Sequence, residues 1–163
     1  MFIKKALKFL SALYIAVITF VTFFPYAIIY EHVTLPIWLD YVRFHCNIIP
    51  FKSIVFYIKA LAENTINRGT PLTFFLGALS FIPLGFCVPI LSRKARSFGK
   101  TILISVLFIA LLELLEMATL AGSFDIDSVI LRTICASFGY FLYYIAKSIY
   151  YKSVNSAKSL DKA

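Results

Sequence analysis

The sequence predicts an all-α integral membrane protein with about four transmembrane helices and a short interfacial helix in the first outer loop. Of its 163 residues, 61% are apolar, whereas an ordinary soluble domain is about half apolar. Four apolar runs reach the length of about 20 residues that spans a bilayer. Lys and Arg gather at alternate ends of these runs, which is typical of a multi-pass topology.

The first apolar run extends from about residue 6 to residue 30, after Lys4, Lys5 and Lys8. A secretory signal peptide also starts with basic residues, but its apolar core is shorter and a small-residue cleavage site follows. We therefore expect a retained transmembrane helix, bent near its outer end by Pro25.

Residues 31–70 mix polar and apolar side chains and form the first outer loop. Within this loop, residues 53–62 have helical periodicity, which places Ile54, Ile58 and Leu61 on one face. A helix of this kind either lies in the membrane interface or caps the end of the bundle, and both interpretations carry equal weight.

The second apolar run, residues 71–91, contains Gly77, Pro83, Gly85 and Pro89. Proline removes a backbone donor and clashes with the preceding turn. In lipid, each carbonyl freed in this way must find another partner. We predict a kinked or broken helix whose irregular part faces protein or water, and a simple kink is the plainer interpretation.

The third and fourth runs cover residues 101–121 and 129–151, joined by a short connector at 122–128. The transmembrane domain then comprises residues 1–152. A polar tail at 153–163 is expected to be cytoplasmic and to lack fixed structure.

Lys and Arg also predict the orientation, with both termini in the cytoplasm. Of 16 basic residues, 11 then lie inside. These are Lys4, Lys5, Lys8, Arg93, Lys94, Arg96, Lys100, Lys147, Lys152, Lys158 and Lys162. The outer loops hold Glu31, Asp40, Glu63, Asp125 and Asp127.

The net charge of +8 does not indicate nucleic acid binding, because the charges flank apolar runs and form no basic face. The lipid bilayer is the expected partner. Cys46, Cys87 and Cys135 form no CxxC pair or Cys/His cluster, so no metal and no cofactor is predicted.

Three charged residues fall inside apolar runs, where charges are costly and therefore candidates for function. Glu113 and Glu116 share a helix face. Glu116 and Arg132 lie at the same depth on neighbouring antiparallel helices, so we predict that they pair, either as a structural clip or as part of a functional site. Glu113 has no expected partner at its depth, so it either stays neutral or lines a water-filled cavity, and we favour the cavity.

A second polar cluster lies in the first outer loop, at residues 43–52. It offers a guanidinium, an imidazole, an amide and an ammonium near the membrane surface, a set able to hold phosphate or carboxylate groups. Considered alone, it would be an ordinary interfacial loop. Joined to the intramembrane charges, it predicts an outer ligand pocket with no catalytic assignment, built from Arg43, Asn47, Lys52, Glu113, Glu116, Asp125, Asp127 and Arg132.

Three segments resemble the VanZ-like membrane proteins, over most of the chain. Residues 47–52, Asn-Ile-Ile-Pro-Phe-Lys, are similar to the family's Asn-Leu-x-Pro-Phe signature. Residues 81–86, Phe-Ile-Pro-Leu-Gly-Phe, are similar to its Phe-x-Pro-Phe/Leu-Gly segment. Residues 113–139 resemble its third segment, and Glu113, Asp125 and Thr133 match it.

The departures mark a divergent member. The family often has Asn, Gln, Asp and Asn where Gly77, Glu116, Ser128 and Arg132 stand, and its paired glycines fall on Cys135 and Ala136. The neutral Gln/Asn pair of the family is replaced here by the oppositely charged Glu116 and Arg132. Because the two changes look linked, we infer that these two positions are in contact.

The resemblance implies a cell-envelope protein of the bacterial cytoplasmic membrane, in a family associated with low-level resistance to lipoglycopeptides such as teicoplanin. One hypothesis is that it binds or repositions a lipid-linked envelope precursor or a lipoglycopeptide at the outer leaflet. A second is a membrane-embedded enzyme using Glu113 and Asp125, which is disfavoured because the sequence has no HExxH or GxSxG motif. A third is a structural partner of an envelope complex.

Overall fold

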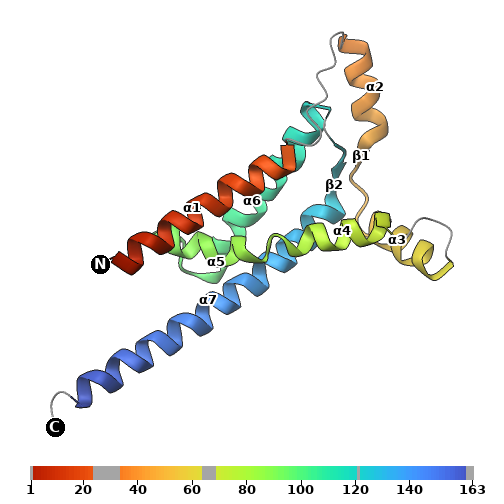
Figure 1. Ribbon diagram of the computed structural model, residues 1–163. Helices are drawn as coiled ribbons and strands as arrows, with labels where there is room; N and C mark the ends of the chain where they lie inside the picture. Colours follow the sequence, from red (N-terminus) through yellow and green to blue (C-terminus); the bar gives the residue numbers. More distant parts are fainter. Residues whose placement is uncertain (1, 24–33, 64–68, 121, 161–163) are drawn as a thin grey trace.

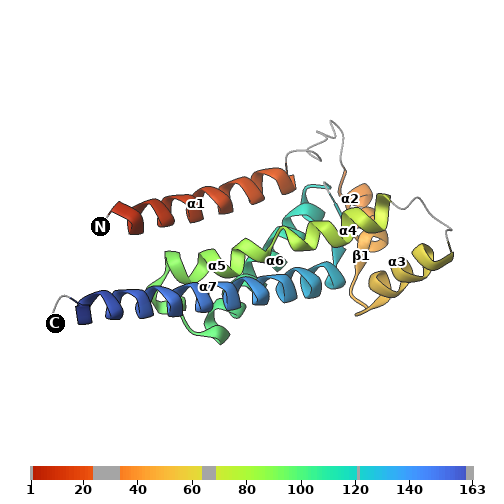
Figure 2. The same ribbon diagram turned by 60° about the horizontal axis from the view of Figure 1, so that its bottom comes forward.

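The structure is a computed structural model that describes residues 2–23, 34–63, 69–120 and 122–160. Its regular secondary structure in these ranges is helical except for two short strands, and four helical segments are long and apolar enough to cross a membrane. The protein is therefore a multi-pass membrane protein, as predicted. The N-terminal end of the first span and the C-terminal end of the last lie at the same end of the molecule (Figures 1 and 2).

The first span is α1, Phe2–Phe23, which begins four residues earlier than predicted. The predicted bend at Pro25 lies outside the described residues. α1 lies along α5 and α6, and Ile18 contributes to the core. Most of its other side chains face outward, as expected for a helix in contact with lipid.

The second span is broken into α4, Gly69–Leu79, and α5, Ile82–Leu91, which confirms the predicted interruption. The break falls at Ser80 and Phe81, just before Pro83. Tyr14 Oη of α1 donates to the Ser80 carbonyl at 2.7 Å, and Ser80 Oγ donates to the Gly77 carbonyl at 2.7 Å. Carbonyls freed by the break thus keep partners, as a lipid environment requires.

The third and fourth spans are α6, Phe98–Ala118, and α7, Ile126–Leu160, which follow a short 3-10 turn, η2, at Arg93–Ala95. The expectation that the tail at 153–163 lacks fixed structure is wrong as far as Leu160, because α7 continues through it. No Gly or Pro stands between residues 152 and 160 to end the helix. At about 1.5 Å per residue, α7 is longer than a bilayer core is thick.

The closest helix contact is between α5 and α7. A Cβ at Gly85 would collide with the Ala136 carbonyl, and one at Gly139 would collide with the Ile82 carbonyl. Small residues at these positions let two backbones touch, the usual basis of helix association in lipid. The buried core extends from this contact to α1 and α6 through Leu84, Ile109 and Leu112.

The remaining elements gather at the end opposite the termini, where α2, Leu35–His45, and α3, Lys52–Glu63, project from the bundle (Figure 1). α3 confirms the helix predicted at 53–62, whereas α2 was not predicted. Two strands of two residues each, β1 at Cys46–Asn47 and β2 at Phe124–Asp125, pair in parallel, which was also not predicted. This pairing brings the connection between the first two spans against the connection between the last two.

The Lys/Arg pattern assigns this end to the outside, and labelling checks the assignment. Cys46 is exposed while Cys87 and Cys135 are buried, so a membrane-impermeant maleimide should label Cys46 on intact cells. In a Cys46→Ser background, Ser97→Cys should react only after the membrane is permeabilised. Labelling in the reverse order would show that the orientation is inverted.

Candidate ligand pocket

Asp125 connects β1 and β2 to the start of the fourth span. Its Oδ1 accepts a hydrogen bond from the Asp127 amide at 2.9 Å, so Asp125 caps the N-terminus of α7. The same oxygen accepts from Asn47 Nδ2 at 3.0 Å. Asn47 also donates to Ser53 Oγ at 3.0 Å, so one amide of β1 contacts both β2 and α3.

Asp127 is fully buried and caps α3, a helix more than seventy residues away in the chain. Its carboxylate accepts from the amides of Phe51 (2.5 Å), Ser53 (2.7 Å) and Ile54 (3.1 Å). Phe51 has a φ of 66°, which is unfavourable for a residue with a side chain. The hydrogen bonds that the Asp127 carboxylate accepts therefore stabilise a turn that would otherwise be strained.

We call Asn47, Asp125 and Asp127 the capping cluster. All three side chains make hydrogen bonds within the protein, so the cluster holds this end of the fold together. The Asp125 amide donates to Glu113 Oε2 at 3.3 Å, which connects the capping cluster to the intramembrane charges.

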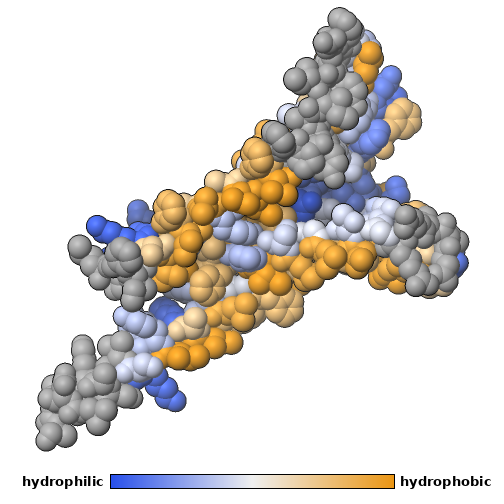
Figure 3. Space-filling model, viewed as in Figure 1, coloured by the Kyte–Doolittle hydropathy of each residue, from blue (hydrophilic) through white to orange (hydrophobic). Residues whose placement is uncertain are grey.

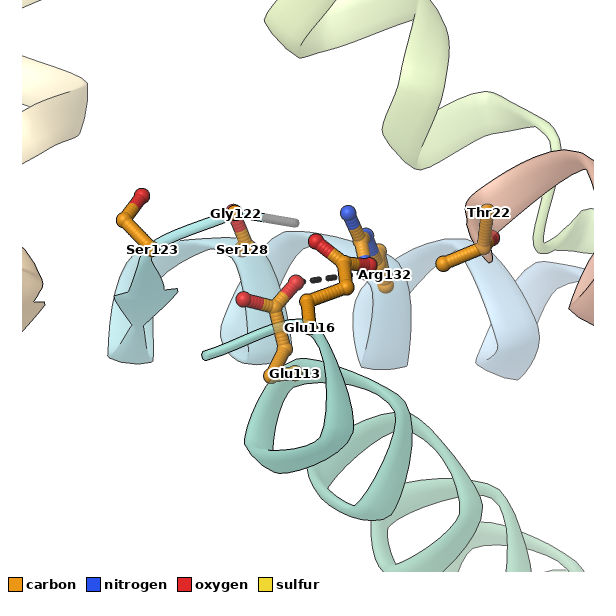
Figure 4. A pocket seen from close by; sticks show the side chains of 7 residues that line it. All are labelled: Thr22, Glu113, Glu116, Gly122, Ser123, Ser128 and Arg132. Atoms are coloured by element: carbon orange, nitrogen blue, oxygen red, sulfur yellow. Dashed lines mark ion pairs between the residues drawn. The ribbon is translucent and has the colours of Figure 1, made fainter. Parts of the chain in front are cut away.

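The intramembrane charges form an arginine cluster of Glu113, Glu116 and Arg132 (Figure 4). Arg132 Nη1 lies 2.5 Å from Glu113 Oε1 and 3.9 Å from Glu116 Oε1. The predicted contact between Glu116 and Arg132 is confirmed. The prediction that Glu113 has no partner is wrong: one helical turn is short compared with the reach of an Arg side chain, so Arg132 reaches the deeper carboxylate.

Phe81, at the break between α4 and α5, completes the surroundings of Arg132. The guanidinium lies 4.9 Å from the centre of its ring, within the range of a cation–π contact. Phe81 is almost wholly buried. The break between α4 and α5 thus places an aromatic ring against the Arg132 guanidinium, whose charge is balanced by Glu113 of α6.

These groups line a pocket of about 330 Å³ between α1, α6 and α7. The lining consists of Thr22, Glu113, Glu116, Gly122, Ser123, Ser128 and Arg132. Figure 4 shows both carboxylates and the guanidinium directed toward one another, with Thr22 approaching from α1. Figure 3 shows hydrophilic surface between the apolar surfaces of α1 and α4, near the end of α1.

Of the eight residues predicted for the site, Glu113, Glu116 and Arg132 line the pocket, and Asn47, Asp125 and Asp127 form the capping cluster beside it. Arg43 and Lys52 are exposed and do not line it. Within the described ranges, no three His, Cys, Asp or Glu side chains are placed to hold a metal ion.

Sequence reasoning missed the neutral part of the lining and the ring under Arg132. Ser123 lies in the connector, where the acids carried the signal, and Ser128 stood out only as a departure from the family pattern. Phe81 lies in a segment whose signal came from its proline and glycine. Thr22 carried no signal, because a lone Thr in an apolar run is ordinary.

A protein-family model described as VanZ/LLP1 matches residues 11–147. This range contains the capping cluster, the arginine cluster and the helix break. No curated protein and no solved structure matches the chain.

The capping cluster predicts the effect of Asp127→Ala. Three amides at the start of α3 lose a charged acceptor, so we expect a loss of about 2–4 kcal/mol in the free energy of unfolding. The amides of Phe51, Ser53 and Ile54 should exchange hydrogen faster in detergent. Asp40→Ala, on exposed α2, is the matched control, and equal losses in the two variants would contradict the capping role.

The arginine cluster predicts non-additive losses. Arg132→Asn leaves Glu113 buried and unpaired, which should lower the free energy of unfolding by about 3–5 kcal/mol. Adding Glu113→Gln should restore most of this loss, and adding Glu116→Gln should restore less because Glu116 is the more distant partner. SDS titration followed by circular dichroism measures the parent, the three single variants and the two double variants, and additive losses would show that the residues do not interact.

Proposed function

The chain belongs to the VanZ/LLP1 family, and on that premise we propose that it binds a polar head group at the outer leaflet of the bacterial membrane. The head group belongs to a lipid-linked envelope precursor or to a lipoglycopeptide of the teicoplanin type. The observation that carries this proposal is the arginine cluster, three charges lining one pocket inside a transmembrane bundle.

The charges of the pocket suit a zwitterionic ligand. Glu113 is 1% exposed and close to Arg132, so its carboxylate is largely neutralised by the guanidinium. Glu116 is 14% exposed and lies farther away, which leaves it able to accept from an ammonium or a sugar hydroxyl. Arg132 has further N–H donors and is 18% exposed, so it can also meet a phosphate or carboxylate.

The size of the pocket limits what can enter. A volume of about 330 Å³ is at the lower end for small-molecule sites. It admits a head group or one substituent of a larger antibiotic, while the rest of the ligand stays in the leaflet or outside it. Binding of this kind shields or redistributes the ligand at the membrane surface without a chemical step.

Expression in a teicoplanin-sensitive host tests the proposal. The parent chain should raise the inhibitory concentration of teicoplanin, and Glu116→Gln should remove most of this increase because it deletes the more available carboxylate. Glu63→Gln is the matched control, since it removes one negative charge from an exposed position near the same end of the bundle.

Equal membrane levels of the three proteins are needed for this comparison. Protection by Glu116→Gln equal to that of the parent would rule out the arginine cluster as the binding site. Absence of protection by the parent would show that this chain does not act on teicoplanin. Its departures from the family pattern, such as Arg132 in place of Asn, would then have changed the ligand.

A further inference from the structure

A second cavity lies at the opposite end of the bundle, near the termini. It has a volume of about 700 Å³ and is bounded by α1, α5, η2 and α7. Five basic residues line it: Lys5, Lys8, Arg93, Arg96 and Lys147. No acidic residue is part of the lining. We call it the basic groove.

The charges of the basic groove are not balanced by the protein. Within the described part of the chain, the ion pairs all involve Arg132, so none of the five cations has an acidic partner. Lys147 Nζ lies 6.0 Å from the centre of the Tyr143 ring, at the outer limit of a cation–π contact. Five like charges around one cavity repel one another and create a strong attraction for an anion.

The position of the groove is fixed by the surrounding helices. Tyr140 Oη of α7 donates to the Arg96 carbonyl at 3.1 Å, which holds the end of η2 against α7. Phe86 of α5 meets Tyr143 of α7 edge to face, with ring centres 6.1 Å apart. The backbone that carries Arg93, Arg96 and Lys147 is therefore held in place, while Lys5, Lys8, Arg93 and Arg96 are exposed to solvent.

The rest of the lining is mostly apolar and includes Leu7, Phe86, Pro89 and Ile90. A soluble phosphate would pair with the cations and leave the apolar part of the lining in contact with water. An amphiphile with a phosphate head and an acyl chain uses both, since the chain removes the apolar wall from water. The combination of a basic rim with an apolar wall between transmembrane helices is suited to a lipid.

We propose that the basic groove is a binding site for one anionic phospholipid, with its phosphate among the five cations and an acyl chain against α1 and α5. The Lys/Arg pattern assigns this end to the cytoplasmic leaflet, where anionic lipids supply the ligand. The site lies at the opposite end from the arginine cluster and does not depend on the function proposed for it.

Native mass spectrometry of the full chain in detergent tests this site with phosphatidylglycerol and phosphatidylcholine as probes. The double variant Arg93→Gln/Arg96→Gln should bind phosphatidylglycerol about 30-fold more weakly, because each cation near an anionic lipid contributes about a factor of five. Lys94→Gln/Lys100→Gln is the matched control, since it removes two charges from the same region without touching the lining. It should bind like the parent.

A second pair, Lys5→Gln/Lys8→Gln on α1, should weaken phosphatidylglycerol binding to a similar degree. Phosphatidylcholine should bind the parent weakly and respond to none of the variants. Equal weakening in the Lys94/Lys100 control would overturn the site in favour of general electrostatic attraction. Complete displacement of phosphatidylglycerol by millimolar inorganic phosphate would also overturn it, because the acyl chain would then contribute nothing.

Discussion

Burial of the Arg132 charge inside a membrane span constrains the rest of the structure. A lone guanidinium in the bilayer is costly, so a partner must stand at its depth on a neighbouring helix. Glu113 supplies that partner at 2.5 Å, which fixes how α6 packs on α7. Phe81 covers another side of the guanidinium at 4.9 Å, which ties the break between α4 and α5 to the same point. Three of the four spans therefore meet at one charged group.

The same requirement explains the capping cluster. Irregular backbone near a membrane is tolerated only where the protein satisfies its polar groups. Asp125 and Asp127 meet this need at the start of α7 and of α3, and the parallel pairing of β1 with β2 holds them in place. The break in the second span is satisfied in the same way by Tyr14. The polar residues at this end thus complete the backbone or line the pocket, and Glu113 does both.

Composition and spacing were sufficient to predict the spans, because the length of an apolar run can be read directly from the sequence. The broken second span followed from Pro83, and α3 from its periodicity. The Glu113 partner could not be predicted, because depth along a helix says nothing about side-chain reach. Nor could the roles of Asp125 and Asp127, since each caps through contacts between residues far apart in sequence. The two-residue strands carry no sequence signal, and the cavities depend on helix packing that the sequence leaves open.

The two ends of the molecule have opposite chemistry, with acids around Arg132 at one end and uncompensated cations at the other. The central claim is that Glu113 is the main partner of Arg132. Solid-state NMR on the protein in lipid bilayers can measure the dipolar coupling between Arg132 side-chain nitrogen and glutamate Cδ. The structure predicts a strong coupling to Glu113 and a weaker one to Glu116. A strong coupling to Glu116 alone, or to neither residue, would contradict this account.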